Sequence, residues 1–483
     1  MAMAASASAC SLASHDVQLP HVAIFPFMAR GHTIPMTHLA HLLRRRGLAT
    51  VTFLTTPANA PFVRRELDDD DDGVAVVELP FPDHVPGVSP GVECVEALDS
   101  LSSLPAFVEA LTELRPRLEA SLAALRPRAG LLVADAFLYW AHASAAALGV
   151  PTVGFFGANM FAQVMREVIL RDNPAAVLVA DGGGAATFAV PDFPHVRLTL
   201  ADIPVPFNDP SPPEQIVEMD AKIGKAVAGS HGLIVNSFDA MECHYIEHWN
   251  RHHVGHRAWP IGPLCLARTT SSPSPCHGAI KPSWMQWLDE KEAAGRAVLY
   301  VALGTVMAVP HAQLREIAGG LEAAGVDFLW AVFEERVEGR GMVVREWVDQ
   351  CRILRHGCVR GFLSHCGWNS VVESISAGVP VAAWPMGAEQ PLNAMLAVDE
   401  LRIGVRVPTT TTDHGLIGRE EIVRVARELM AMAGEENGAG GAAARNAAAL
   451  AAKAREAMAE GGSSWKTLEQ MLAAVCLPAD PRK

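Results

Sequence analysis

The stretch from residue 347 to residue 390 constrains the fold of this chain more than any other part of the sequence. It predicts a strand over residues 359–364, a tight turn at 365–367, a helix that begins at Asn369 and stops at Gly378, and a second strand over 379–384. Glycine suits the left-handed conformation that ends many helices. Strand, helix and strand in this order are typical of a parallel sheet covered by helices. The expected fold class is therefore α/β.

The expected start of this helix carries groups that suit a phosphate. Gly367 lies just before it, and a helix N-terminus offers unpaired backbone N–H groups and a partial positive charge. His365, Asn369 and Ser370 add further donors around that end. Glu373 lies one turn further on the Asn369 face, where a carboxylate can accept hydrogen bonds from a diol such as a ribose. The spacing suits a nucleotide diphosphate.

A second strand–helix–strand unit lies near the start of the chain. It predicts a strand over 21–27, a turn over 28–31, a helix with Pro35 near its first turn and a strand over 49–54. His32 falls at the carboxyl end of the first strand, where α/β sheets bind ligands. Because a helix N-terminus disfavours the imidazolium, we expect His32 to be neutral and available as a base. The alternative is a capping or merely exposed histidine, since most of the 19 histidines must be inert.

An apolar strand over residues 131–135 ends in Asp135. An aspartate at the end of an apolar strand needs a partner. It is interpreted either as a helix cap or as the group that holds the tautomer of His32 and stabilises its cation. The two interpretations are compatible.

Aromatic and methionine side chains gather in the sequence at these strand ends. Several of them beside a base predict an apolar pocket for a lipophilic molecule. The alternative, for any one of them, is a place in the core. The candidates for the pocket are Phe27, Met28, Phe137, Trp140 and Phe156.

The sequence also contains patterns that resemble a zinc site and a hydrolase serine. A zinc site built from Cys351, His356, Cys358, His365 and Cys366 is disfavoured, because neighbouring residues at a strand end point opposite ways and no C-x-x-C pair exists. A hydrolase serine in the G-x-S-x-G pattern at 87–91 is rejected, because its oxyanion hole needs the N–H that a proline after the serine lacks. We expect no metal and no other bound cofactor.

Composition limits the partners and the compartment. The net charge of −14 argues against nucleic acid and anionic membranes. The nine cysteines have irregular spacing, which favours a reducing cytoplasm. A secretory signal begins with positively charged residues, but the first twenty residues contain no Lys or Arg. No uninterrupted apolar run is long enough to cross a membrane. We expect a cytoplasmic monomer without a membrane span.

The stretch 347–390 resembles the signature box of plant family-1 UDP-dependent glycosyltransferases, which glycosylate small lipophilic molecules. His32 and Asp135 also lie in contexts similar to those of the family's catalytic pair, in Pro-Phe-x-x-x-Gly-His and Ala-Asp-Ala-Phe. The matching positions of the box are Trp347, Gln350, Ile353, Leu354, His356, Gly361, Phe362, His365 to Ser370, Glu373, Gly378 to Pro380, Pro385, Glu389 and Gln390.

The resemblance implies roles for the residues of the box. Trp347 would stack on uracil, the backbone of Val348 would read it, and Gln350 would hold the ribose with Glu373. His365, Asn369 and Ser370 would bind the diphosphate, with Thr305 as a further contact unless it is ordinary turn chemistry. Trp368, Glu389 and Gln390 would hold the sugar. The family often has Ala-Pro where this chain has Val348-Asp349, and a longer loop where it has only Ala331-Val332.

The resemblance also implies the GT-B architecture, two facing Rossmann-like domains with a cleft between them, and sugar transfer from a UDP-sugar to a hydroxyl with inversion. The expected donor is UDP-glucose, and the expected acceptor is a flavonoid, simple phenol or terpenoid. Two alternatives to this function are a UDP-sugar-binding protein without activity and, less favoured, a His/Asp hydrolase. The expected parts are a disordered 1–19, an acceptor-binding domain over 20–255, a linker over 256–283, a UDP-sugar-binding domain over 284–462 and a C-terminal helical segment over 463–483.

Overall fold

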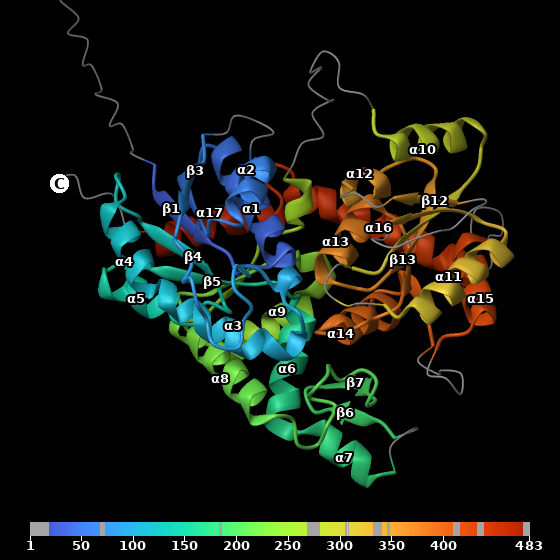
Figure 1. Ribbon diagram of the computed structural model, residues 1–483, viewed down its shortest axis with the longest axis horizontal. Coiled ribbons are helices and arrows are strands. Elements are labelled where there is room, and N and C mark those ends of the chain that lie inside the picture. Colours follow the sequence, from blue (N-terminus) through green and yellow to red (C-terminus); the bar gives the residue numbers. More distant parts are fainter. Residues whose placement is uncertain are drawn as a thin grey trace, which may run out of the picture.

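The computed structural model describes residues 19–67, 73–182, 186–267, 281–304, 307, 309–331, 341–344, 348–408, 416–431 and 439–476. Two parallel sheets, each flanked by helices, lie side by side in Figure 1. The α/β class and the GT-B arrangement predicted from the sequence are confirmed. Much of the predicted linker lies outside the described residues.

In the described part of the first half, parallel strands pair in the order β3-β2-β1-β4-β5-β8-β9. The strands are β1 His21–Phe25, β2 Thr50–Thr55, β3 Ala75–Glu78, β4 Leu131–Asp135, β5 Thr152–Phe156, β8 Leu233–Val235 and β9 Ala258–Pro260. Strands β1 and β4 are buried along their whole length, because helices cover both faces of the sheet. Strand β9 follows residue 255, so this sheet extends beyond the expected domain boundary.

The helices of the first half begin with α1, Arg30–Arg45, which ends in the cations Arg44 and Arg45. An antiparallel pair, β6 Phe188–Val190 and β7 Phe193–Leu198, lies beside α7. The other helices are α2 Ala60–Leu67, α3 Leu104–Ala110, α4 Arg115–Ala124, α5 Ala141–Ala147, α6 Met160–Asp172, α7 Pro174–Ala180, α8 Glu214–Gly229 and α9 Asp239–His252, with short 3-10 turns at Val95–Ala97, Leu101–Ser103, Leu111–Leu114 and Leu264–Leu266.

In the described part of the second half, parallel strands pair in the order β12-β11-β10-β13-β14-β15. The strands are β10 Val298–Ala302, β11 Asp327–Ala331, β12 Gly341–Val344, β13 Val359–Ser364, β14 Val381–Ala383 and β15 Gly404–Arg406. The helices are α10 Ser283–Ala293, α11 His311–Ala324, α12 Gln350–Leu354, α13 Trp368–Ala377, α14 Gln390–Met395 with a π turn over Leu396–Glu400, α15 Arg419–Met430, α16 Ala439–Met458 and α17 Ser463–Val475.

Strand β13 has the bounds expected from the sequence, and α13 begins one residue earlier than expected, at Trp368. Gly378 ends α13 with φ 74°, the left-handed cap that the sequence predicts. This unit places the start of α13 at the carboxyl edge of the second sheet. The edge faces the first half of the chain.

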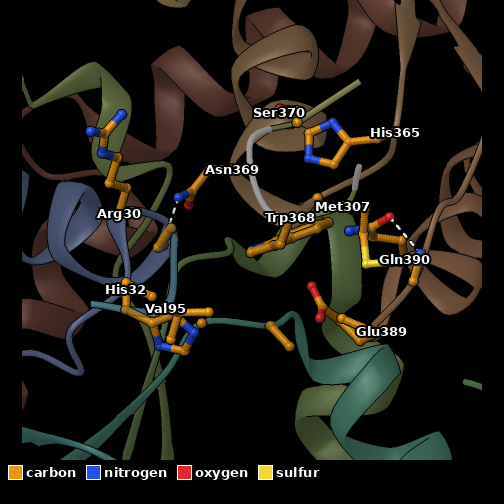
Figure 2. A pocket seen from close by; sticks show the side chains of 18 of the residues that line it. Arg30, His32, Val95, Met307, His365, Trp368, Asn369, Ser370, Glu389 and Gln390 are labelled. Carbon is orange, nitrogen blue, oxygen red and sulfur yellow. Dashed lines mark hydrogen bonds between the residues drawn. The ribbon is translucent and has the colours of Figure 1, made fainter. Parts of the chain in front are cut away.

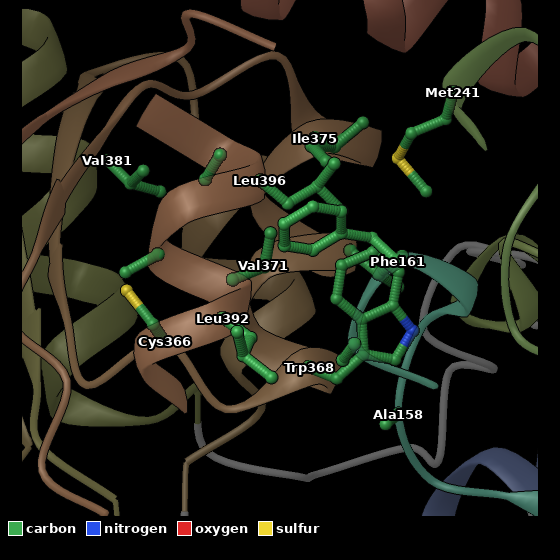
Figure 3. Packing of buried hydrophobic residues seen from close by; sticks show 14 of the residues in the cluster. Ala158, Phe161, Met241, Cys366, Trp368, Val371, Ile375, Val381, Leu392 and Leu396 are labelled. Atoms are coloured by element: carbon green, nitrogen blue, oxygen red, sulfur yellow. The ribbon is translucent and has the colours of Figure 1, made fainter. Parts of the chain in front are cut away.

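A shared hydrophobic core joins the two halves. Figure 3 shows Phe161 of α6 and Met241 of α9 beside Trp368 and Ile375 of α13. The last helix, α17, also crosses between the halves: Leu468 and Met471 are fully buried against the first sheet. Near them, the guanidinium of Arg46 lies 3.4 Å from the centre of the Trp465 ring. The sequence predicts the α17 helix but not its return to the first half.

Candidate active site

A cleft of about 2000 Å³ lies between the two halves and is lined by residues from both. Figure 2 shows His32 on one side and the start of α13, with Asn369 and Ser370, on the other. We call the two sides the polar wall and the apolar wall. The polar wall consists of Gln350, His365, Asn369, Ser370, Glu373, Glu389 and Gln390, and the apolar wall consists of Phe27, Phe137, Phe156, Ile169, Met219 and Ile223 around His32.

His32 and Asp135 are directly hydrogen bonded. Nδ1 of His32 lies 2.7 Å from Oδ2 of Asp135. Because a carboxylate accepts and does not donate, Nδ1 carries the proton, and Nε2 is left with a lone pair. The other oxygen of Asp135 accepts from the backbone N–H of Phe137 at 3.0 Å. Asp135 is therefore both a partner of the histidine and an anchor of the turn after β4, as its two interpretations allow.

The protonation of His32 differs from the expectation. Burial lowers its pKa, but the charge and hydrogen bond of Asp135, with smaller effects of Glu389 and Glu96, leave the pKa above its ordinary value of 6.5. The sequence argument considered only the helix N-terminus, which lowers the pKa of a histidine, whereas the pKa of His32 is raised. The neighbouring carboxylates outweigh the effect of burial, so His32 is a stronger base than a free histidine.

Aromatic rings surround His32 in the apolar wall. The rings of Phe27 and Phe137 stack with centroids 4.7 Å apart, and Phe156 stacks on Phe137 at 6.3 Å. The imidazole meets Phe27 and Phe137 edge-on at 5.3 Å and 5.4 Å. These rings form a flat apolar surface beside the base.

Two of the five residues expected in the pocket are core residues instead. Trp140 is 2% exposed, packs edge-on against Phe25 at 6.2 Å and does not line the cleft. Met28 is also 2% exposed and packs in the same core. Both follow strand ends, but their side chains pack into the core and do not line the cleft. The prediction for Met28 and Trp140 was therefore wrong.

His365 lies at the end of β13, between two glycines. A methyl group at Gly367 would lie 2.6 Å from Nε2 of His365, and one at Gly304 would lie 2.8 Å from Cδ2. Gly304 also has φ 81°, which disfavours any other residue. Burial lowers the pKa of His365 to about 4, and its Nδ1 lies 3.4 Å from the carbonyl oxygen of Ala302. This ring is therefore neutral at physiological pH.

The side chains expected at the ribose are hydrogen bonded to one another. Nε2 of Gln350 donates to Ser370 at 2.9 Å and to Glu373 at 2.8 Å, and its oxygen accepts from Tyr300 at 3.2 Å. Burial raises the pKa of Glu373 to about 7. The network fixes the orientation of Gln350 before any ligand binds. Tyr300 is a member that sequence reasoning missed.

The residues expected at the sugar are held by their own loop. The side-chain oxygen of Gln390 accepts from the backbone N–H of Met386 at 2.8 Å and of Gly387 at 3.0 Å. Glu389 accepts from Asn393 at 3.1 Å. The indole of Trp368 is 2% exposed and donates to the backbone oxygen of Asn236 at 3.0 Å. Trp368 therefore lines the cleft mainly as part of the joint between the halves.

Some of the residues singled out in the sequence lie outside the residues that the structure describes. Thr305 and Trp347 lie outside the described residues, and so does Val332 of the short connection after Ala331. Val348 is described and lines the cleft next to Gln350. The roles implied for Thr305 and Trp347 stay predictions.

Hydrogen bonds between the halves hold the two walls in place, and sequence reasoning missed them. Asn369 donates to the backbone oxygen of Gly31 at 2.7 Å, next to His32 (Figure 2). Asn159, which caps α6, donates to Asn393 at 2.7 Å, and both are fully buried. Because these partners are more than 200 residues apart, no local pattern indicates them.

The side chains weighed for zinc do not converge. Sγ of Cys358 lies 3.2 Å from Nδ1 of His356, whose Nε2 lies 3.2 Å from Asp289, while His365 lines the cleft. Among the described residues, no group of three or more His, Cys, Asp or Glu side chains is placed to hold a metal ion. In the same part of the chain, no helix has the length and apolar character to cross a membrane.

Comparison with known proteins agrees with this geometry. Residues 276–413 match the family model described as UDP-glucoronosyl and UDP-glucosyl transferase. The chain is 38% identical to UDP-glycosyltransferase 90A1 of Arabidopsis thaliana, over 95% of this chain and 97% of that protein. It is 33% identical to UDP-glucose flavonoid 3-O-glucosyltransferase 7 of Fragaria ananassa, over 96% of this chain and 97% of that protein.

Solved structures are similar over the same length. The structure of UGT73P12 of Glycyrrhiza uralensis, complexed with glycyrrhetinic acid 3-O-monoglucuronide, has a TM-score of 0.82 at 28% identity and covers 95% of this chain and 96% of that chain. The structure of UGT2 of Phytolacca americana, complexed with UDP-2fluoro-glucose and pterostilbene, has a TM-score of 0.73 at 26% identity and covers 94% and 99%.

Proposed function

This chain belongs to the family of plant UDP-dependent glycosyltransferases, and from this premise we propose that it transfers glucose from UDP-glucose to a hydroxyl of a small lipophilic acceptor, with inversion. The observation that carries the proposal is the position of His32, which is hydrogen bonded to the buried Asp135 and lines the same cleft as the N-terminus of α13. A base on one wall and an anion site on the other are the two groups that the reaction needs.

The proposed chemistry follows from these two groups. The acceptor oxygen attacks the anomeric carbon from the side opposite UDP, and Nε2 of His32 takes its proton. Asp135 stabilises the imidazolium that forms, as a buried carboxylate does in a catalytic triad. The bond from the anomeric carbon to the phosphate oxygen breaks, and UDP leaves with its negative charge on the backbone N–H groups at the start of α13. Attack opposite the leaving group inverts the anomeric centre.

The fixed dipoles of α13 supply the charge stabilisation in this proposal, so the transfer uses no metal. Activity that is unchanged after dialysis against EDTA is the expected result. Loss of activity that Mg²⁺ or Mn²⁺ restores would contradict this part of the proposal.

Two observations support UDP-glucose as the donor. Glu389 and Gln390 offer adjacent polar side chains that can contact neighbouring hydroxyls, and both line the cleft. The Fragaria relative is named for UDP-glucose, and the Phytolacca structure holds UDP-2fluoro-glucose. We expect kcat/KM to be higher for UDP-glucose than for UDP-galactose or UDP-glucuronate. A clear preference for either of the latter would refute the assignment.

The stacked rings of the apolar wall support a flat or rigid lipophilic acceptor, such as a flavonoid, simple phenol or terpenoid. Relatives are named for a flavonoid, an anthocyanin and scopoletin, and solved structures hold pterostilbene and quercetin. Incubation with UDP-glucose and a mixed panel of such compounds, analysed by mass spectrometry, is the test. Glucosides of one or more panel members are expected. UDP binding without any transfer would instead favour the inactive sugar-nucleotide binder.

We also propose that the enzyme is a monomer in the cytoplasm. The irregular cysteine pattern supports a reducing compartment. Light scattering after size exclusion tests the first statement, and imaging of a fluorescent fusion tests the second.

A further inference from the structure

The cleft continues beyond His32 and its aromatic rings, into a channel between α6, α8 and the loop over residues 204–213. The channel is largely apolar: Ile169, Met219 and Ile223 line it, and so does Phe207 from the loop. At its outer end, Val205 and Leu170 are 67% and 38% exposed. A molecule bound at His32 can therefore extend along this channel toward the surface.

A charged pair interrupts this apolar channel. Arg166 of α6 donates to Asp220 of α8 from Nε at 2.7 Å and from Nη2 at 2.6 Å, and Nη2 also donates to the backbone oxygen of Asp220 at 2.9 Å. Both residues line the cleft, with side chains only 16% and 12% exposed. Within the described part of the chain, no group accepts a hydrogen bond from Nη1 of Arg166.

The ion pair of Arg166 and Asp220 leaves one donor of the arginine unused, which a purely structural ion pair does not need. Burying two charges costs desolvation energy, and apolar residues of the same volume often stabilise a protein as well or better. Here the pair also keeps an unused donor, Nη1, because Asp220 bonds only to Nε and Nη2, and both residues line the channel. Because the two charges neutralise each other, an anion gains little from the arginine and is repelled by the aspartate. An uncharged hydroxyl can accept from Arg166 or donate to Asp220.

We propose that Arg166 and Asp220 form a second, polar subsite of the acceptor pocket, which binds an uncharged oxygen substituent at the far end of an elongated acceptor. The acceptor lies along the channel, with the hydroxyl that becomes glycosylated at His32 and a second hydroxyl at the pair. This inference deepens the proposed function and rests on it. It narrows the acceptor class from any lipophilic hydroxyl compound to rigid molecules with hydroxyl groups at both ends.

Matched acceptors test the subsite without any mutation. The probes are biphenyl-4-ol (the mono-ol), 4,4'-dihydroxybiphenyl (the diol) and 4'-hydroxybiphenyl-4-carboxylate (the carboxylate). A second, longer series carries the same three substitution patterns on para-terphenyl. After correction for its two equivalent hydroxyls, the diol of one length should have a kcat/KM roughly tenfold or more above the mono-ol, as a hydrogen bond to a charged group gives. The carboxylate should be no better than the mono-ol.

Equal kcat/KM for diol and mono-ol at both lengths would overturn the subsite, and so would a preference for the carboxylate. Calorimetric binding of the same compounds to the UDP-saturated enzyme gives a readout that does not depend on transfer. If none of these probes is glycosylated, tighter binding of the diol would still support the subsite, and the mixed acceptor panel separately decides the proposed function. Equal binding of diol and mono-ol would overturn it.

A double variant, Arg166→Met with Asp220→Leu, removes the polar groups and leaves an apolar channel. The ratio of kcat/KM for diol to mono-ol should fall to about one, because both compounds then meet an apolar channel, while KM for UDP-glucose stays near its wild-type value. The control is Arg171→Met, which breaks the exposed pair with Asp172 (2.7 Å) on the same helix, outside the cleft lining. A diol preference that survives in the folded double variant, verified by its melting temperature, would overturn the proposal.

Discussion

The polar wall of the cleft comes from one continuous part of the sequence, whereas the apolar wall is assembled from strand ends and helices between Phe27 and Ile223. The polar wall already has its hydrogen bonds in place, such as those of Gln350 with Glu373 and Ser370. The apolar wall has stacked rings and few polar groups. Fixed polar contacts suit the UDP of the donor, which is the same in every reaction of the family. An apolar surface suits the acceptor, which differs among the relatives.

This difference separates two effects that mutations can have. Changes in the apolar wall around His32 should alter chemistry or acceptor choice and leave UDP binding intact. Changes in the polar wall should alter UDP-sugar binding. The predictions below test this separation, from the largest expected effect to the smallest.

Replacement of the base should have the largest effect. His32→Ala should lower turnover by roughly 10² to 10⁴, the range for loss of a general base, with UDP-glucose affinity nearly unchanged. Steady-state kinetics of the purified variant check this, with circular dichroism to verify folding. Turnover close to wild type in the folded variant would remove His32 from the mechanism.

Asp135→Asn should cause a smaller loss of turnover and change the pH profile. Asp135 raises the pKa of His32, and the base works only when unprotonated. Wild-type kcat/KM should therefore rise with pH along a limb centred above 6.5, and the variant's limb should move to lower pH. An unchanged limb would show that Asp135 does not set this pKa. A variant that unfolds would instead assign Asp135 to the turn that it anchors through Phe137.

Replacing Phe137 by alanine should impair acceptor binding, whereas replacing Trp140 by alanine should reduce stability. Phe137→Ala should raise KM for the acceptor by about tenfold and leave KM for UDP-glucose unchanged, since its ring faces the cleft. Trp140→Ala should lower the free energy of unfolding by about 3 to 5 kcal/mol, because its ring fills the core. Acceptor kinetics and urea unfolding of both variants check this. A folded Trp140→Ala enzyme whose main defect is in acceptor KM would contradict the placement of Trp140 in the core.

The polar wall should show the smallest effect, a dependence of donor binding on pH. Burial raises the pKa of Glu373 to about 7, and ribose hydroxyls donate best to its ionised form. KM for UDP-glucose should therefore rise severalfold as the pH falls below about 7 and stay constant well above it. Glu373→Gln should flatten the profile. The same slope in wild type and variant would show that another group titrates.

The sequence predicts the polar wall well because its residues share one short segment with its own strand and helix. Strand β13 and the cap of α13 at Gly378 occur where expected, since both follow from local patterns. The pairing of His32 with Asp135 is a long-range contact that became predictable through the family resemblance. Taken alone, the sequence around Asp135 also fits an ordinary helix cap, and the sequence around His32 also fits a capping or exposed histidine.

Other features depend on contacts that no local pattern reports. Whether an aromatic residue after a strand faces the cleft or the core depends on the turn, so Phe137 and Trp140 could not be told apart. The pKa of His32 depends on carboxylates from three distant segments. The bond between Asn159 and Asn393 exists only once the halves meet.

The most direct test of the separation between the walls is calorimetric titration of UDP into wild type, His32→Ala and Glu373→Ala, with turnover measured on the same preparations. The account predicts that His32→Ala binds UDP within about threefold of wild type while turnover falls roughly 10² to 10⁴, and that Glu373→Ala loses UDP affinity. If His32→Ala loses UDP affinity in proportion to turnover, or Glu373→Ala binds UDP as wild type does, the two walls do not divide chemistry from donor binding and the account is wrong.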